Sequence, residues 1–369
     1  MKIFFPLEVF YPSQAGGPAN TTYWITKNLQ KHGFETVIVA TDKGIQPQIP
    51  LNKWLNTDGG NAVYVKTHFL NFPLYQTIIS LSNFYKADIV HISSFFFPTS
   101  FVTAFAARIL KKKMVWSARG ELDTAALNHS RYRKKPILWL IKKIIGKYPV
   151  FHSTCNEETA YIKNVFGEEA RIAQIPNFIE IPEKVERNKQ KYLLYIGRIH
   201  PKKAIDNLIK AVAISEEFME SEFILKIAGK GKKEFEVDLH KLVEKLDLSE
   251  KVIFVGQVEG EEKQKLLADA FWTIMPSHTE NFGIVVLESL AQSTPVIASK
   301  GSPWASLETE KIGFWTDNEP EILAGRLKEI LEMPETVYNE YRSRCRRFVE
   351  NEFDISRNID NWINLYRNL

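Results

Sequence analysis

The sequence has few of the features that mark several classes of protein. Its two cysteines, Cys155 and Cys345, are too few for a disulfide framework and too far apart for the paired spacing of a zinc site. No segment reaches the roughly 18 consecutive apolar residues that a membrane-spanning helix requires. No Asp-x-Asp sequence occurs that would hold a divalent ion between two carboxylates, and no short repeat or low-complexity tract is present. We therefore expect a soluble, cytoplasmic protein without a metal site.

What remains is the composition of an ordinary globular protein. Hydrophobic residues make up 44% and charged residues 25% of the chain, which excludes a disordered or fibrous protein. The length of 369 residues suits two domains, because single domains usually contain about 100–200 residues. Basic residues outnumber acidic ones in residues 1–179, whereas acidic residues are in excess in the remainder. The first half is therefore expected to face an anionic partner, which leaves nucleic acid, a phospholipid surface and an anionic small molecule as alternatives.

Short apolar runs alternate with helical patterns along most of the chain. A first series spans 2–175, with strand-like runs such as 3–9 and 34–40 separated by segments long enough for helices. Prolines and charged residues predict a linker at 175–191, and a second series of the same kind spans 192–298. Strands joined by helical crossovers predict parallel sheets. The fold class is therefore α/β, with two doubly wound, Rossmann-like domains and ligand sites at the carboxyl ends of their strands.

The segment 278–288 combines a strand end, a glycine and two glutamates. Apolar residues surround Glu288 on nearly every side of the helix that the pattern predicts after Gly283, so its carboxylate has little access to water. A buried carboxylate needs hydrogen-bond donors. Two sources of donors remain open, namely nearby backbone amides in a structural role or two hydroxyls of a sugar ring such as a ribose. Glu280 lies at the tip of a strand, and the free amides of residues 283–285 suit a phosphate.

A second cluster, 197–203, follows the first strand of the second domain. Arg198 and Lys203 would project into the crevice at the carboxyl end of that strand, where two cations beside helix amides would bind a diphosphate. A solvated basic loop is the alternative. In the first domain, Gly16 and Gly17 link the first strand to the first helix. Paired glycines let a phosphate approach the backbone, although a plain turn explains them equally well.

The segment 131–147 contains seven basic and no acidic residues. From Pro136 the pattern predicts an amphipathic helix with Trp139 on one flank, which is typical of an anchor on an anionic membrane surface. A core-facing helix with a solvated cationic edge fits the same pattern. Nucleic acid is not an expected partner, because no known reader motif accompanies the charge.

Taken together, these segments resemble the retaining glycosyltransferases of family 4, which have the GT-B fold. The resemblance extends over essentially the whole chain and rests on the order and spacing of motifs that are modest one by one. These are Gly16-Gly17-Pro18, Asp88-Ile89-Val90-His91-Ile92, Ile175-Pro176-Asn177, Gly197-Arg198 through Lys203, Gly229-Lys230-Gly231, Val252 to Gly256, the Glu280/Glu288 pair, Asn281-Phe282-Gly283 and Pro295-Val296-Ile297-Ala298.

The resemblance implies two Rossmann-like domains that face each other across a cleft. An acceptor-binding domain would span residues 1–178, and a nucleotide-sugar-binding domain would span residues 179–351. A C-terminal helix at about 352–369 would return to the first domain. The sequence pattern agrees with such a helix, because residues 335–369 are helical in periodicity and end in an apolar stripe.

The resemblance also implies the transfer of a hexose from a UDP- or GDP-linked donor to an acceptor, with retention and without a metal ion or other cofactor. The expected catalytic residues are Glu280, Arg198 and Lys203. Arg198 and Lys203 would hold the diphosphate, and Glu288 would hold the ribose. Glu280 would orient the donor sugar together with neighbouring amides, and Gly17 would approach the distal phosphate. The full set of candidate donor-binding residues is Gly16, Gly17, Arg198, Lys203, Gln257, Val258, Glu280, Asn281, Phe282, Gly283, Ile284 and Glu288.

Two departures from the family pattern bear on these roles. Many members place a histidine that touches the donor sugar after the strand at 113–117, where this sequence has Arg119 and Glu121. These two residues and His91 are therefore the candidate acceptor-binding residues. Ala204 replaces the glycine that usually follows the phosphate lysine, a minor change if its backbone dihedrals are ordinary.

The segments around Arg119 and 301–304 look like those of a subgroup that builds bacterial surface polysaccharides such as lipopolysaccharide or capsule. Acceptors in that subgroup are often lipid-linked saccharides. The expected partners are thus a nucleotide-sugar, a lipid-linked saccharide and an anionic membrane surface, contacted through 131–147 at the inner face of the membrane. The alternatives are a nucleotide-sugar epimerase or a phosphorylase of the same architecture, and a non-catalytic scaffold that binds a nucleotide-sugar or a membrane.

Overall fold

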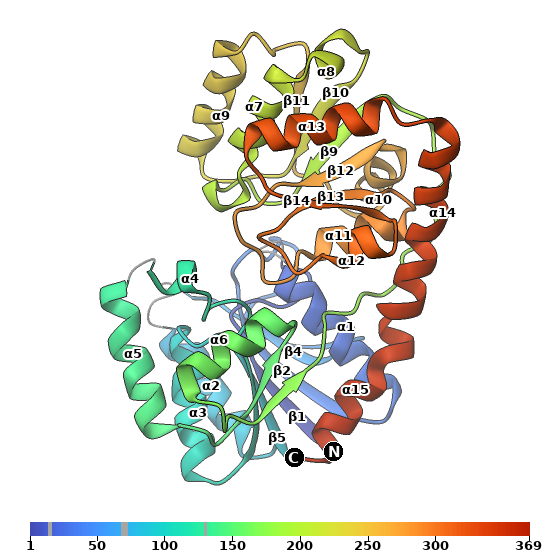
Figure 1. The fold of residues 1–369 in the computed structure, drawn as a ribbon. Helices are drawn as coiled ribbons and strands as arrows, with labels where there is room; N and C mark the ends of the chain where they lie inside the picture. The colour runs from blue at the N-terminus through green and yellow to red at the C-terminus, as the bar shows by residue number, and fades with distance from the viewer. Residues whose placement is uncertain (14–16, 68–72, 129–130) are drawn as a thin grey trace. The chain divides into compact units, whose positions relative to one another are not determined.

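A computed structural model describes residues 1–13, 17–67, 73–128 and 131–369. The chain divides into two compact units, each built around its own sheet (Figure 1). Unit 1 comprises Met1–Glu180 and Ile355–Leu369, and unit 2 comprises Ile181–Asp354. The boundaries expected at residues 178 and 351 lie a few residues before those of the structure.

Unit 1 contains an eight-stranded sheet in the order β3-β4-β2-β1-β5-β6-β7-β8. Its strands are β1 (Lys2–Pro6), β2 (Glu35–Thr41), β3 (Trp54–Thr57), β4 (Gly60–Val65), β5 (Ile89–Ser93), β6 (Lys113–Ser117), β7 (Val150–Ser153) and β8 (Ile172–Gln174). All neighbouring pairs are parallel except β3 and β4, which form an antiparallel hairpin at one edge. The apolar runs of the sequence do not indicate β3, because its side chains are only half-buried or exposed.

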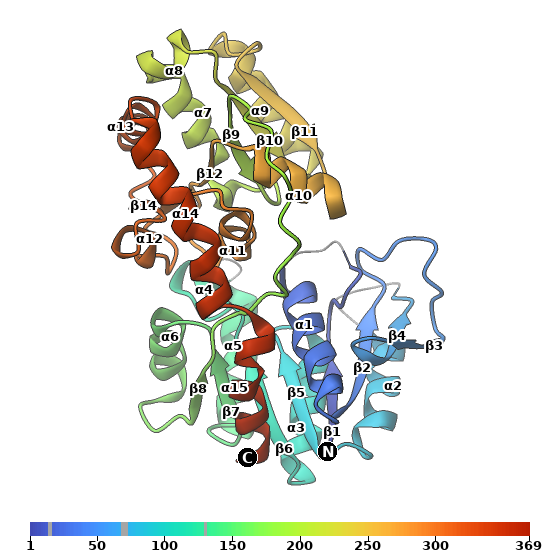
Figure 2. The ribbon, with the colours of Figure 1, turned by 90° about the vertical axis from the view of Figure 1, so that its right-hand side faces the viewer.

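Helices cover both faces of this sheet. On one face α1 (Gly17–Lys31) packs beside the C-terminal α15 (Ile355–Arg367), which Figure 2 shows lying along unit 1. On the other face, α2 (Leu74–Phe84), α3 (Pro98–Ile109), α5 (Arg131–Ile144) and α6 (Asn156–Phe166) share one hydrophobic cluster with the sheet. The short α4 (Thr124–Asn128) precedes α5.

The basic helix α5 begins earlier than the sequence pattern predicts. The expected start was Pro136, but the helix already runs from Arg131, so Pro136 lies inside it. A proline ring has no N–H to donate to the carbonyl four residues back, that of Tyr132, so α5 lacks this hydrogen bond in its second turn.

Unit 2 contains a six-stranded, all-parallel sheet in the order β11-β10-β9-β12-β13-β14. Its strands are β9 (Tyr192–Ile196), β10 (Ile224–Ala228), β11 (Val252–Gly256), β12 (Trp272–Met275), β13 (Val296–Ser299) and β14 (Gly313–Thr316). The side chains of β9 alternate between two cores: Leu193 and Tyr195 join the larger cluster, and Tyr192, Leu194 and Ile196 join the smaller one.

The helices of unit 2 lie on both faces of its sheet. The larger cluster includes α7 (Ile205–Ile214), α8 (Glu216–Glu220), α9 (Lys233–Lys245) and α13 (Pro320–Leu331), whereas α10 (Gly260–Asp269) and α11 (Ile284–Ala291) contact the smaller one. The remaining helices are the 3₁₀ helix η1 (Pro201–Lys203), α12 (Ser306–Thr309) and α14 (Glu335–Glu352).

The C-terminal segment forms two helices, and the second lies within the 352–369 range expected for the returning helix. α14 ends at Glu352, and α15 begins at Ile355 and belongs to unit 1. The amide of Ile355 donates to the carbonyl of Ile179 at 2.9 Å, so the two places where the chain passes between the units are bonded to each other. The apolar stripe expected at the end of the chain is buried, with Trp362 and Tyr366 at 1% and 0% exposure.

Candidate functional site

The candidate site lies where the strand order of unit 2 reverses. The chain adds β10 and β11 to one side of β9 and places β12, β13 and β14 on the other, so the reversal falls between β9 and β12. Doubly wound sheets bind ligands at such a switch point. The segments that follow β9 and β12 meet there, because the amide of His278 donates to the carbonyl of Lys202 at 2.9 Å.

The segment after β9 turns into η1 and carries Lys203 toward the segment after β12. His200 starts η1 by accepting a hydrogen bond from the amide of Lys202 at its Nδ1, at 3.1 Å. Ala204 ends η1 with φ at 49°, in the left-handed region. The replacement of glycine at Ala204 is therefore not conformationally neutral, because a side chain in this region costs about 1 kcal/mol.

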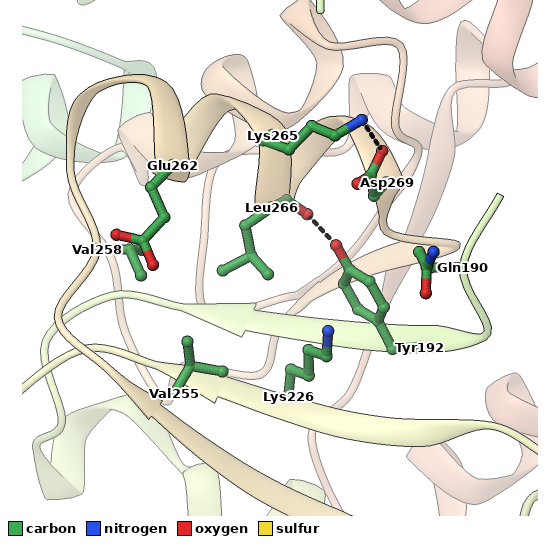
Figure 3. Close-up of a pocket in the computed structure, with 9 residues that line it drawn as sticks. All are labelled: Gln190, Tyr192, Lys226, Val255, Val258, Glu262, Lys265, Leu266 and Asp269. Atoms are coloured by element: carbon green, nitrogen blue, oxygen red, sulfur yellow. Dashed lines mark hydrogen bonds and ion pairs between the residues drawn. The ribbon is translucent and has the colours of Figure 1, made fainter. Parts of the chain in front are cut away.

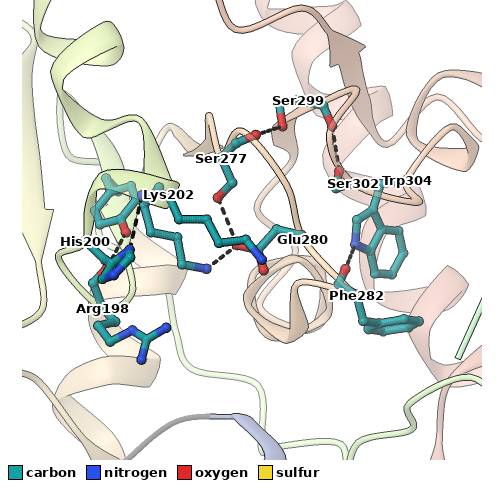
Figure 4. A network of polar contacts seen from close by, with 11 residues as sticks. Arg198, His200, Lys202, Ser277, Glu280, Phe282, Ser299, Ser302 and Trp304 are labelled. Carbon is teal, nitrogen blue, oxygen red and sulfur yellow. Dashed lines mark hydrogen bonds and ion pairs between the residues drawn. The ribbon is translucent and has the colours of Figure 1, made fainter. Parts of the chain in front are cut away.

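Lys203 and Glu280 form an ion pair at the centre of this region. Their side chains are 20% and 12% exposed. Figure 4 shows the side chain of Glu280 next to that of Ser277. The hydroxyl of Ser277 donates to the same carboxylate oxygen, Oε1, at 2.8 Å. Arg198 lies on the same segment as Lys203, and its side chain is exposed. The three residues predicted to be catalytic thus come from two neighbouring segments, and Lys203 would reach a diphosphate only by sharing or leaving the carboxylate of Glu280.

Glu288 is buried in α11, as its apolar neighbours predict, and is 8% exposed. Its Oε1 accepts a hydrogen bond from Nζ of Lys263 on α10 at 2.7 Å. Among the described residues, Lys263 supplies the hydrogen-bond donor that the buried carboxylate of Glu288 requires. The donor is therefore a side chain, whereas backbone amides were one of the sources considered from the sequence. Lys263 was missed because it lies 25 residues away on another helix.

The first turn of α11 presents the predicted backbone amides. Gly283 precedes the helix with φ at 79°, and a Cβ at this position would lie 2.7 Å from Sδ of Met275. No other residue fits there without strain. The amides of Ile284 and Val285 belong to the first turn, whose N–H groups have no partner within a helix. The structure places Asn281 and Phe282 immediately before them, with Phe282 7% exposed.

Gln257 and Val258, two of the candidate donor-binding residues, lie between β11 and α10. Val258 is buried, and Nε2 of Gln257 donates to Glu259 at 2.7 Å. A hollow of about 250 Å³ adjoins Val258 between the sheet and α10 (Figure 3). Its walls include Val255, Leu266 and the ring of Tyr192.

Comparison with known proteins assigns the family. Residues 15–182 match the family described as Glycosyltransferase Family 4, and residues 177–352 match the family described as Glycosyl transferases group 1. The chain belongs to glycosyltransferase family 4. The described residues of this family 4 chain contain no group of three or more His, Cys, Asp and Glu side chains that would hold a metal ion.

Individual relatives support the same assignment. An uncharacterized glycosyltransferase of Methanocaldococcus jannaschii is 28% identical over 363 residues, 90% of this chain and 89% of the relative. The O-antigen chain mannosyltransferase of Salmonella typhimurium is 25% identical over 214 residues, 57% of each chain. The Anabaena protein HepE, solved in complex with UDP-glucose, superposes with a TM-score of 0.80 at 17% identity, covering 100% of both chains. The two Rossmann-like domains of this family 4 glycosyltransferase have the GT-B fold.

In unit 1 of this family 4 chain, His91 is not placed to bind an acceptor. The side chain is 1% exposed and both ring nitrogens are bonded, Nδ1 to the hydroxyl of Tyr366 at 2.6 Å and Nε2 to Oγ of Ser117 at 2.8 Å. The prediction of His91 as an acceptor-binding residue is wrong, because β5 directs the ring into the core beneath α15. Burial lowers the pKa of His91 well below its usual value, and the nearby His152 and Arg119 add to this.

Burial keeps both histidines neutral, because it lowers the pKa of His91 well below its usual value and that of His152 to about 3. With both rings neutral, the hydrogen bonds that continue from His91 through the core have one direction. His152 bonds the carbonyl of Ile175 through Nε2 at 2.8 Å, and since a carbonyl only accepts, Nε2 carries the proton. Nδ1 of His152 therefore accepts from Ser117 at 2.8 Å, Ser117 accepts from His91, and His91 accepts from Tyr366. This chain of bonds ties α15 to Ile175, where the predicted linker begins.

Arg119 and Glu121 lie together in the segment after β6. The guanidinium of Arg119 donates to Asn177 at 3.1 Å and to Thr22 on α1 at 3.4 Å, and burial lowers its pKa. The carboxylate of Glu121 accepts a hydrogen bond from Ser94 at 2.6 Å. Burial raises the pKa of Glu121, although the hydrogen bond from Ser94 by itself lowers it. Acceptor binding by these two residues remains a prediction.

A carboxylate that the sequence did not single out holds this segment in place. Glu158, 1% exposed, accepts from the amides of Gly120 at 2.6 Å and Thr154 at 2.7 Å. It is one of two adjacent glutamates in the first turn of α6, where acidic residues are common, so the sequence offered no signal of burial. Of the two predicted glycines in unit 1, Gly17 begins α1, whereas Gly16 lies outside the described residues.

The helix α5 packs in the core through Ile141 and exposes most of its basic residues. Its outer face also carries Tyr132 and Trp139, which are 93% and 60% exposed. Nζ of Lys143 lies 5.1 Å from the ring centroid of Trp139. α5 is therefore a core-facing helix whose outward face is both cationic and aromatic. No helix among the described residues is long and apolar enough to cross a bilayer.

Proposed function

We propose that this glycosyltransferase moves a hexose from a UDP- or GDP-linked donor to a saccharide acceptor, with retention and without a metal ion. The observation that carries the proposal is the meeting of Lys203 and Glu280 at the strand-order reversal, beside the first turn of α11. The structurally similar HepE was solved with UDP-glucose bound, which supports a nucleotide-sugar donor here.

The chemistry follows from how charge develops when the glycosidic bond to the diphosphate breaks. The departing diphosphate gains negative charge, and fixed cations and helix amides stabilise that charge more than they stabilise the bound donor. Arg198 and Lys203 supply the cations, and the amides after Gly283 supply the helix terminus. Glu280 accepts donor-sugar hydroxyls, and Glu288 accepts those of the ribose.

The acceptor that fits this protein best is a lipid-linked saccharide at the inner face of a membrane. The name of the Salmonella relative refers to the O-antigen chain, which supports a role in surface-polysaccharide synthesis. The exposed cations and aromatic rings of α5 suit an anionic lipid surface, where basic residues contribute about 1 kcal/mol each.

The test is transfer and nucleotide binding by Lys203→Met and Glu288→Ala, compared with Lys245→Ala, which removes an exposed lysine from α9 in the same unit. Both site variants should lose at least about 100-fold in kcat/KM and bind UDP or GDP more weakly, while Lys245→Ala stays at the wild-type level. Turnover near the wild-type level in either site variant would exclude the assigned site.

The products distinguish the proposal from its alternatives. NMR of the product should show the anomeric configuration of the donor preserved in a new glycosidic bond. Conversion of the donor sugar without any acceptor would instead identify an epimerase. Calorimetric binding of a nucleotide-sugar without turnover on lipid-linked saccharides would identify a scaffold.

A further inference from the structure

A second backbone segment runs beside the one that carries Glu280 and leads into α11 (Figure 4). This strip, residues 299–304, begins at the last residue of β13, and the segment beside it, residues 277–283, follows β12. Three hydrogen bonds join them at both ends and in the middle: Oγ of Ser299 to the carbonyl of Ser277, the amide of Glu280 to the carbonyl of Gly301 at 2.7 Å, and Nε1 of Trp304 to the carbonyl of Phe282.

The strip is held close and firmly. A Cβ at Gly301 would lie 2.2 Å from the carbonyl oxygen of His278, so only glycine allows the two backbones to approach this far. Ser302 donates from its hydroxyl to the carbonyl of Ser299 at 2.6 Å, and its own carbonyl accepts from Nε1 of Trp315 at 2.8 Å. The strip therefore has its own support and does not depend on the segment beside it.

Trp304 is the member of the strip with the largest buried side chain. It is 2% exposed. Its ring meets that of Phe282 edge to face, with centroids 5.1 Å apart and planes at 67°, and lies 5.6 Å from that of Phe353 at the end of α14. Such ring pairs contribute about 0.5–1.5 kcal/mol beyond the burial of their area. The indole N–H is thus fixed in position and direction before any ligand arrives.

The bond from Trp304 determines where the next amide points. The carbonyl of Phe282 and the N–H of Gly283 belong to one planar peptide and point in opposite directions. Fixing the carbonyl toward Trp304 therefore fixes the N–H of Gly283 on the side away from it. Gly283 itself provides no such restraint, because glycine is the residue with the most backbone freedom.

We infer that Trp304 is a positioning residue, which aims the amide of Gly283 at the sugar of the donor. The inference rests on the proposed function, and it assigns the amide of Gly283 and the carboxylate of Glu280 to the donor sugar, whereas the amides of Ile284 and Val285 serve the diphosphate. Without the indole N–H the peptide between Phe282 and Gly283 would rotate more freely, and the ordering would have to occur on binding. The diphosphate contacts would be retained, because Ile284 and Val285 lie within α11 and the cations of Arg198 and Lys203 lie on another segment.

The test compares nucleotides with and without a sugar in Trp304→Phe, which keeps a ring against Phe282 and Phe353 but removes the N–H. Calorimetry with UDP, GDP, UDP-glucose and GDP-mannose should show nucleoside diphosphate affinity within about twofold of wild type. Nucleotide-sugar affinity and kcat/KM should fall roughly fivefold, as expected for one hydrogen bond of about 1 kcal/mol. Trp315→Phe is the matched control, because it loses an indole hydrogen bond to the same strip but none to Phe282. Its ratio of nucleotide-sugar affinity to nucleoside diphosphate affinity should not change.

Phe353→Leu provides a second variant, which keeps the indole N–H but removes a ring that packs against Trp304. It should also lower the ratio of nucleotide-sugar affinity to nucleoside diphosphate affinity, by a smaller factor than Trp304→Phe. Equal weakening for nucleotides with and without sugar would reduce Trp304 to a structural role and overturn the inference. An unchanged ratio in Trp304→Phe would also overturn it. Failure of the wild-type protein to bind any of the four nucleotides would instead remove the proposed function, and the inference with it.

Discussion

Lys263 decides how Glu288 is held inside α11. The ammonium offsets the carboxylate at 2.7 Å, and both side chains are mostly buried, at 22% and 11% exposure. Lys263→Met should leave an unpaired carboxylate in a site with little water, which is costly and disturbs its orientation. We expect UDP or GDP to bind roughly tenfold more weakly to Lys263→Met by calorimetry, and about 100-fold more weakly to Glu288→Ala.

Lys210→Met is the control for this comparison, because Lys210 also pairs with a carboxylate, that of Asp206 on α7 at 2.9 Å, and does not line the hollow beside Val258. It should bind nucleotide as wild type does. Unaltered UDP or GDP affinity in Lys263→Met would show that the ion pair with Lys263 does not contribute to nucleotide binding by Glu288.

The histidine chain in unit 1 predicts a pH dependence for the docking of α15. Burial lowers the pKa of His152 to about 3 and that of His91 well below its usual value. Both are neutral in the folded protein, so protons bind preferentially to the unfolded segment once the pH falls below about 6.5, the usual value of histidine. Stability is full above that pH and is lost progressively as the pH falls toward the folded values. For His152, whose pKa in the folded protein is about 3, the loss at pH 5 is roughly 2 kcal/mol, and His91 contributes in the same direction.

Hydrogen exchange of residues 355–367, corrected for the intrinsic rate, should therefore be faster at pH 5 than at pH 7.5. Tyr366→Phe removes the bond to His91 and should raise exchange at both pH values. His240→Asn changes an exposed histidine on α9 and should leave the pH effect as it is. Protection of α15 that does not depend on pH would contradict the neutral chain.

The unit 2 site residues proposed from the sequence lie mainly in two short stretches of chain, 197–203 and 278–288. Glu280 and Glu288 lie within one strand–loop–helix passage, where apolar periodicity alone shows that a carboxylate is enclosed. Lys263, Glu158 and Trp304 act on groups that are distant in sequence or on another element, and nothing near them in the chain marks their partners. The prediction for His91 failed for a related reason. A strand pattern shows that side chains alternate between the two faces of the sheet, but it does not show which face the C-terminal helix will cover.

At the scale of elements, the sequence patterns located the strands that consist of continuous apolar runs. They missed strands that lack such a run. The runs at 192–196 and 113–117 coincide with β9 and β6. β3 is an edge strand with exposed side chains, and β14 and α13 follow a stretch interrupted by charges, so neither gave a clear period. The break between α14 and α15 contains no proline or glycine, and its only local signal is Asp354, which directly precedes α15 and is of a type common at helix starts.

The helix α5 carries a prediction that belongs to the element as a whole. Substituting glutamine for Arg133, Lys135, Lys142 and Lys143, all exposed, removes four charges without touching the buried Ile141. Each cation near an anionic surface contributes about 1 kcal/mol, so partitioning to phosphatidylserine-containing vesicles should fall at least about 100-fold. Salt should weaken the wild type in the same way.

The matched control removes four exposed lysines from unit 2, Lys232, Lys233, Lys241 and Lys245. This change has the same effect on net charge and should leave vesicle binding nearly intact. Equal loss in both variants would mean that overall charge, and not α5, determines binding. Unchanged partitioning of the α5 variant would remove the membrane contact altogether.

At the scale of the whole molecule, the two units differ in charge and in expected task. Unit 1 is basic and contains the segments predicted to meet the acceptor, whereas unit 2 is acidic and pairs Lys203 and Lys263 with Glu280 and Glu288. An acidic unit that binds an anionic nucleotide must do so through local groups, since its net charge opposes the ligand. Donor binding therefore depends on Arg198, Lys203 and the α11 amides.

Hydrogen exchange across the whole chain tests this division. Ligand that binds the native form at 100 times its Kd stabilises the structure that holds it by about 2.7 kcal/mol. UDP or GDP at that excess should slow exchange in residues 197–204 and 276–291, while α15 and residues 113–121 of unit 1 exchange as before. Slower exchange confined to unit 1 would show that the nucleotide binds there and not to unit 2. It would contradict the argument that the α11 amides, Arg198 and Lys203 bind the diphosphate.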